Sequence, residues 1–128
     1  MSTPWLGDAC GLVDAYRAKN LSPLEALEDC IAAIERSPLN AFSFTDFDRA
    51  REAATYADVT RPFGGVPFGI KELERVEGWP YTEASVLFKD RVADEDDTSV
   101  CRLRASGAVL AAQTTAPEFG GINCTSTV

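Results

Sequence analysis

An almost unbroken apolar run, AVLAAQTT, occupies residues 108–115 and most restricts what this chain can fold into. Such a run is typical of a strand that is covered on both faces of a sheet. Just before it, a helix is expected over residues 99–105, with Asp97 as its N-cap and Gly107 as its stop. The run therefore predicts a central strand that follows a helix.

A second strand is predicted upstream, beginning at Val66. Alternation places Val66, Phe68 and Ile70 on one side of it, and Lys71 stands at its carboxyl end on the other side. The order strand, helix, strand suggests a βαβ unit. If its two strands are parallel, Lys71 lies at the sheet edge where ligands bind in open α/β sheets.

Helices are predicted before these strands. The stretch 22–36 has Ser22 as N-cap, Pro23 at the first helical position and Glu25 closing a capping box. The same reasoning gives a shorter helix over residues 7–19, a short strand over 41–45 and helical spacing over 47–58.

Charge and composition restrict the function. The net charge of −8 and the pI near 4.4 argue against binding to nucleic acid or to an anionic membrane, since both need clustered Lys and Arg. No signal peptide and no stretch of membrane-spanning length is visible, so a cytoplasmic location is expected.

The chain contains no histidine, which excludes Ser-His-Asp and Cys-His mechanisms within it and argues against a catalytic metal. Its four cysteines lack the close spacing of a zinc or redox pair. Neither a metal nor a cofactor is expected. Among the three lysines, Lys19 and Lys89 have polar surroundings, which leaves Lys71 as the unusual one.

Three segments in order, GVPFGIKE, GWPYTEAS and SGAVLAAQTTAPEFGG, resemble the amidase signature hydrolases over residues 62–128. In that family the strand ends in Lys, usually followed by Asp, and the buried strand leads into a segment where Asn is common. Here Glu72 replaces the Asp and Thr115 stands at the Asn position. These departures concern substrate preference more than membership.

The resemblance implies an α/β fold in which N-terminal helices pack on the first strands of a larger mixed sheet. Residues 1–60 would form the helical region, and residues 61–128 the first part of the amidase core with the βαβ unit. The family's Gly-Gly-Ser-Ser-Gly-rich stretch normally follows the APEFGG segment, and the chain ends at Val128 before reaching one. The chain is therefore expected to be an N-terminal fragment, incomplete as given.

The resemblance also implies an amidase with a Ser-Ser-Lys mechanism, of which this chain supplies only the base, Lys71. A serine would attack the amide, and its proton would pass through a second serine to the uncharged lysine. Free lysine side chains keep their proton at neutral pH, so a base of this kind must be desolvated. We expect Phe68 and Ile70 to provide that burial, with Glu72 and Glu74 pointing away; the fragment alone should be inactive.

A second candidate site is Gly120, which the resemblance places near the acyl group of the substrate. The alternative is that Gly120 and Gly121 end a short helical turn begun at Pro117. Thr82 and Ser85 could be mistaken for the nucleophile, but they are expected to stabilise a loop.

The expected partners are a small-molecule amide and the remainder of the amidase chain, with no nucleic acid and no membrane; a homo-oligomer is left open. Two other functions also stay open. One is a Schiff-base enzyme, in which a desolvated lysine attacks a carbonyl directly. The other is a non-catalytic interaction or scaffold chain with the same fold, in which Lys71 simply extends into water.

Overall fold

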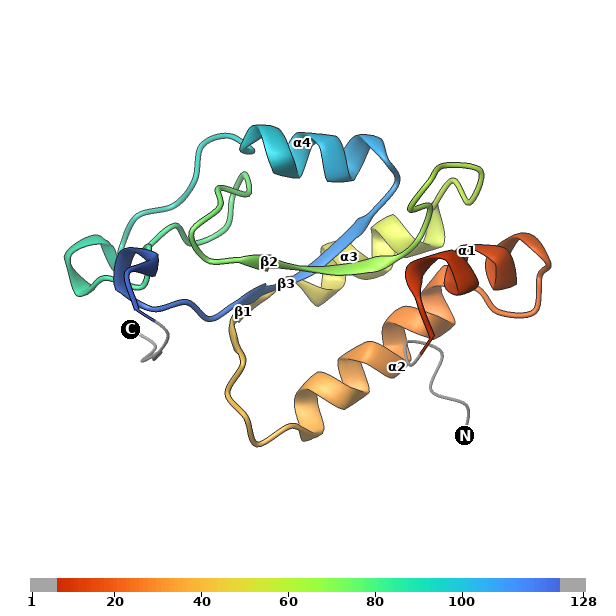
Figure 1. Ribbon diagram of the computed structural model, residues 1–128, viewed down its shortest axis with the longest axis horizontal. Helices are drawn as coiled ribbons and strands as arrows, with labels where there is room; N and C mark the ends of the chain where they lie inside the picture. Colours follow the sequence, from red (N-terminus) through yellow and green to blue (C-terminus); the bar gives the residue numbers. More distant parts are fainter. Residues whose placement is uncertain (1–6, 123–128) are drawn as a thin grey trace. The chain divides into compact units, whose positions relative to one another are not determined.

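The computed structural model describes residues 7–122 (Figure 1). Its elements follow in the order α1 (Ala9–Arg17), α2 (Pro23–Arg36), β1 (Phe42–Thr45), α3 (Phe47–Thr55), β2 (Pro67–Lys71), η2 (Val86–Phe88), α4 (Thr98–Ala105), β3 (Val109–Thr114) and η3 (Glu118–Gly120), where η denotes a short 3-10 helix. No helix within these residues is long and apolar enough to cross a membrane.

The three strands form one sheet in the order β1-β3-β2, so β3 is the central strand (Figure 1). β1 runs antiparallel to β3, with Phe44 opposite Gln113. The residue numbers on β2 and β3 rise together, because Val109 N–H donates to the oxygen of Val66 and Glu72 N–H donates to that of Thr114. β2 and β3 are therefore parallel strands of a mixed sheet, and α4 lies between them in the sequence.

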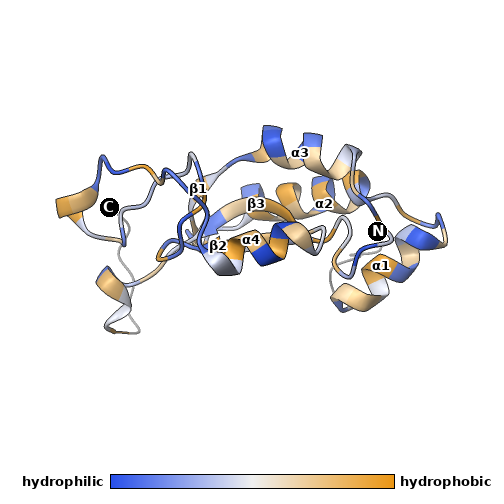
Figure 2. Ribbon diagram, turned by 90° about the horizontal axis from the view of Figure 1, so that it is seen from above, coloured by the Kyte–Doolittle hydropathy of each residue, from blue (hydrophilic) through white to orange (hydrophobic). Residues whose placement is uncertain are grey.

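The central strand is buried, as its apolar sequence predicts. Its first five residues are all buried, and Figure 2 shows hydrophobic residues along the first part of its ribbon. Gly107 ends the preceding helix with φ +89, and a Cβ there would lie 2.9 Å from the Cα of Gly64. A glycine is needed at this turn because both the backbone angle and the close approach exclude a side chain.

Helix α2 begins at its predicted start signal. The Ser22 hydroxyl accepts from Glu25 N–H at 3.2 Å, and the Glu25 carboxylate accepts from Ser22 N–H at 2.8 Å, which is the predicted capping box. Asp97 precedes α4 as predicted, but its carboxylate bonds to Arg75 instead, accepting from the backbone N–H at 2.7 Å and from Nε at 2.9 Å.

Among the described residues the chain divides into two compact units. Unit 1 contains residues 7–38, 46–68 and 103–111, and unit 2 contains residues 39–45, 69–102 and 112–122. Two hydrophobic clusters occupy unit 1: one joins α2, α3 and β3 around Leu27, and the other joins α1 and α2 around Val13. The predicted site residues Lys71 and Gly120 both belong to unit 2.

Candidate active site

Lys71 is the last residue of β2, and its side chain is exposed. Within residues 7–122 its ammonium group has no ion pair and no hydrogen bond. Phe68 and Ile70 do not bury it as expected, because alternation along the strand directs them to the other side, where Ile70 is 5% exposed. The groups that would desolvate Lys71 are thus missing from the described residues.

The two carboxylates that follow are both hydrogen-bonded. Glu72 is 3% exposed, and its Oε1 accepts from Ala116 N–H at 2.6 Å. Glu74 is half-buried, and its Oε2 accepts from the Ser99 hydroxyl at 2.7 Å. The burial of Glu72 could have been inferred from the sequence, because alternation puts it on the same side as Ile70. Its bond to Ala116 joins positions 44 residues apart, so no local pattern signals it.

Gly120 ends η3, the short turn that begins after Pro117, with its N–H donating to the Pro117 oxygen at 2.8 Å. Its φ is +71, and a Cβ there would lie 2.7 Å from Cδ1 of Leu73. The turn expected as the alternative role of Gly120 is therefore present. The same contact brings Gly120 beside the residue two positions after Lys71, so the structure places the two candidate positions in one neighbourhood.

The segment around η3 is fixed by the loop of residues 80–92. Ser85 donates from its hydroxyl to Glu118 Oε1 at 2.7 Å, and Phe119 N–H donates to the Glu83 oxygen at 3.0 Å. Ser85 is 1% exposed, and the Thr82 hydroxyl accepts from Ala84 N–H at 3.1 Å. Both hydroxyls stabilise the loop, as predicted.

Arg91 stabilises the loop of residues 80–92 through contacts with other residues of the same loop. Its guanidinium lies 4.1 Å from the ring centroids of both Tyr81 and Phe88, and its Nε donates to the Tyr81 oxygen at 2.7 Å. A hydrogen bond to Glu83 raises the pKa of the Tyr81 hydroxyl. Glu83 and Ala84 both have positive φ, of 51 and 56, so the loop holds backbone strain as well.

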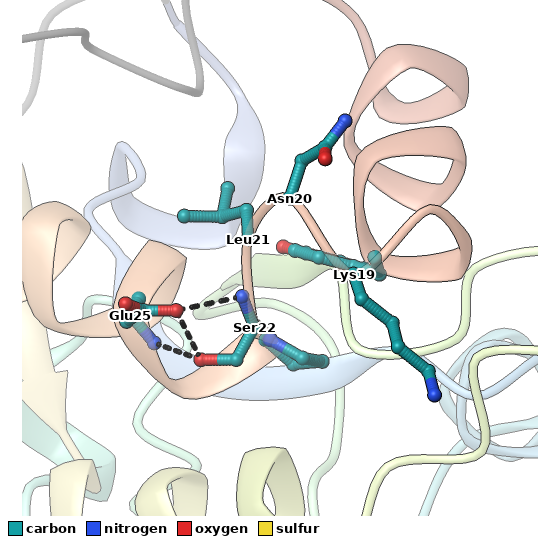
Figure 3. A pocket seen from close by; sticks show the side chains of 7 residues that line it. Lys19, Asn20, Leu21, Ser22 and Glu25 are labelled. Carbon is teal, nitrogen blue, oxygen red and sulfur yellow. Dashed lines mark hydrogen bonds between the residues drawn. The ribbon is translucent and has the colours of Figure 1, made fainter.

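A separate open hollow of about 330 Å³ lies in unit 1 at the start of α2 (Figure 3). Figure 3 shows Ser22 and Glu25 bonded to each other and Lys19 extending away from them. The polar groups of Ser22 and Glu25 in this hollow are hydrogen-bonded to each other in the cap of α2. We therefore place no site in this hollow. Among residues 7–122 no three His, Cys, Asp or Glu side chains gather to hold a metal ion.

Comparison with known proteins gives a consistent result. The family model described as Amidase matches residues 25–128. A glutamyl-tRNA(Gln) amidotransferase subunit from Methylacidiphilum infernorum is 37% identical over 103 residues, which are 79% of this chain and 21% of the relative. An acylamidase from Rhodococcus erythropolis is 30% identical over 125 residues, covering 91% of this chain and 26% of its own length.

Solved structures match over the same region. A 6-aminohexanoate cyclic dimer hydrolase superposes with a TM-score of 0.87 at 28% identity, covering 98% of this chain and 26% of that one. The predicted α/β fold, with helices and a small mixed sheet, thus corresponds to the N-terminal part of such structures. The chain spans about a quarter of the length of the curated relatives that it matches.

Proposed function

Because the chain belongs to the amidase family, we propose that it supplies Lys71 as the proton acceptor of an amide hydrolase with a Ser-Ser-Lys mechanism. The observation that carries the proposal is the position of this lysine. It ends β2, the outer strand of a parallel pair, and the neighbouring Leu73 contacts the Gly120 turn. Ligands in open α/β sheets bind at the carboxyl edge of such strands.

In the proposed reaction a serine oxygen attacks the amide carbonyl, and its proton passes through a second serine to Lys71. The lysine then returns the proton to the nitrogen as the carbon–nitrogen bond breaks, which releases the amine and leaves an ester on the serine. Water cleaves that ester. Both serines would come from the part of an amidase that this chain does not cover, since it spans about a quarter of its relatives.

Lys71 can accept a proton only if it is uncharged, which requires a desolvated surrounding without a carboxylate partner. Its lack of an ion pair among residues 7–122 supports this role, as do the bonds that engage Glu72 and Glu74 elsewhere. We propose that the remainder of the amidase chain covers the exposed lysine. The substrate would be a small-molecule amide whose acyl group approaches the backbone at Gly120.

The test is Lys71→Ala in the amidase polypeptide that contains residues 1–128, with Lys89→Ala as the control. Lys89 is also exposed, but it lies in the loop after η2. We expect Lys71→Ala to lower kcat/KM for amide hydrolysis by several orders of magnitude and Lys89→Ala to leave it unchanged. A folded Lys71→Ala protein with near-normal turnover would contradict the proposal. Labelling of Lys71 by substrate and borohydride would indicate a Schiff-base enzyme instead.

Residues 1–128 alone should hydrolyse no amide, because they supply the base without its serines. Measured with a chromogenic amide, the purified chain should give no rate above the buffer. Activity should appear only when the rest of an amidase domain is present. Hydrolysis by the isolated chain would mean that Lys71 works with a nucleophile inside these residues.

A further inference from the structure

Glu72 is a buried carboxylate that no step of the proposed reaction uses. It is 3% exposed and is the only acidic or basic residue among the buried ones within residues 7–122. A carboxylate is costly to bury unless it is hydrogen-bonded. Its placement directly after Lys71 therefore calls for a role that a smaller or apolar residue could not fill.

Two hydrogen bonds of Glu72 join the residue after β2 to the end of β3 and to the chain that follows it. Its backbone N–H donates to the Thr114 oxygen at 3.0 Å, and its Oε1 accepts from Ala116 N–H at 2.6 Å. The second is a short bond to a charged acceptor, which is stronger than a bond between neutral groups. Glu72 thus fixes the start of the segment that leads to Gly120.

The side chain of Lys71 has no such attachment, since it is exposed and bonds to no other residue among those described. The position of the Lys71 Cα is set by the backbone. The hydrogen bonds of Glu72 fix that backbone at the next residue. We propose that Glu72 is a positioning residue, which holds the backbone of Lys71 in register with residues 116–120 and so acts on the reaction through Lys71. This inference rests on the proposed function.

The test compares two variants of nearly equal length in the amidase polypeptide that contains this chain. Glu72→Gln keeps an oxygen that can accept from Ala116 N–H, whereas Glu72→Met does not. We expect Glu72→Gln to keep kcat within about threefold and Glu72→Met to lower kcat by about 10²-fold with KM nearly unchanged, since misplacement by 1 Å can cost that much. Glu74→Gln and Glu74→Met are the matched controls and should leave kcat unchanged.

A second variant removes the donor instead of the acceptor. Replacing Ala116 by lactic acid turns its peptide N–H into an ester oxygen and leaves Glu72 intact, so the loss in kcat should equal that of Glu72→Met. If Glu72→Met does not fold, the ester variant at position 116 still tests whether the bond between Ala116 N–H and Glu72 is needed. Combined with Lys71→Ala, Glu72→Met should lower the residual rate no further.

The results separate the two proposals. Equal losses in Glu72→Gln and Glu72→Met would show that the charge, and not the bond, matters, and would overturn the positioning role. Full kcat in the folded ester variant would overturn it as well, as would a further drop when Glu72→Met is added to Lys71→Ala. If Lys71→Ala alone leaves the rate intact, the proposed function fails, whatever Glu72 does.

Discussion

The two units of the molecule are stabilised in different ways. Both hydrophobic clusters of the described residues lie in unit 1, around Leu27 and Val13. Among residues 7–122 the buried side chains of polar type, Glu72, Ser85 and Gln113, all lie in unit 2 and are hydrogen-bonded, whereas the buried hydroxyl of Tyr16 in unit 1 has no partner among these residues. A buried polar group that is hydrogen-bonded helps to specify one arrangement of the chain around it. Unit 1 is organised as a scaffold and unit 2 as a precisely bonded region, which is where an active site would be expected.

Exposed apolar side chains strengthen this contrast. Most of the large exposed hydrophobic residues belong to unit 2, namely Leu39, Val86, Leu87, Val92, Phe119 and Ile122, against Tyr56 in unit 1. Positive φ at non-glycine residues is concentrated there as well, at Asn40, Glu83, Ala84 and Phe119. Strain and exposed apolar surface are features of functional regions more than of scaffolds.

The largest expected effect on stability is in unit 1. Leu27 is 0% exposed at the centre of the cluster that joins α2, α3 and β3, so Leu27→Ala should lower the free energy of unfolding by about 2–5 kcal/mol. Urea denaturation of the purified protein measures it. Leu39→Ala, at a residue 79% exposed, is the control and should change it by less than about 0.5 kcal/mol. Equal losses would contradict the scaffold role of unit 1.

The next effect compares two similar bonds within unit 2. The hydroxyls of Ser85 and Ser99 each donate to a glutamate at 2.7 Å, but Ser85 is buried and Ser99 is exposed. Ser85→Ala should lower the free energy of unfolding by about 1–3 kcal/mol, and Ser99→Ala by less than about 0.5 kcal/mol, because water replaces the lost donor only at the surface. Similar values in urea denaturation would show that burial does not distinguish the two bonds.

Replacing an exposed lysine by glycine should change the free energy of unfolding by a smaller amount. The change should have opposite signs in the two units. Lys19 follows α1 with φ +60, whereas Lys89 follows η2 with φ −52, and both are exposed. Lys19→Gly should raise the free energy of unfolding by about 1 kcal/mol because glycine favours the left-handed conformation, and Lys89→Gly should lower it by about 0.5 kcal/mol. Thermal melting of both variants tests the signs.

The smallest expected effect is a dependence of the free energy of unfolding on pH, caused by Asp97 in unit 2. Hydrogen bonding from the Arg75 backbone, and then from its guanidinium, holds the pKa of the Asp97 carboxyl below its ordinary value. The unfolded chain therefore binds this proton first as the pH falls. The stability that Asp97 contributes is complete above about pH 5 and is lost as the pH falls through its lower native value. Asp97→Asn should remove this acid-dependent part, whereas Asp94→Asn should not.

Local patterns in the sequence predicted most of the helices and strands. They also placed Lys71 at the carboxyl end of a strand. The capping box at Ser22, the stop at Gly107 and the buried strand after it are all set by residues a few positions apart. The pairing of β1 with β3 and the bond between Glu72 and Ala116 join distant positions, so no spacing reveals them. The exposure of Lys71 was predicted only as an alternative, because the residues that cover the end of a strand come from distant parts of the sequence.

The order of the strands also bears on how the protein is made. The central strand β3 is the last of the three along the sequence, and Ser43 on β1 lies 70 residues before its partner Gln113. During synthesis from the N-terminus, α1 and α2 can form and pack early, whereas β1 and β2 have no strand between them until β3 has emerged. Sheet assembly thus waits for late residues and depends on distant pairing, which is slow. The capping bonds of α2 join Ser22 and Glu25, which both lie within the first 25 residues. Helix α2 can therefore begin to form while the rest of the chain is still being translated.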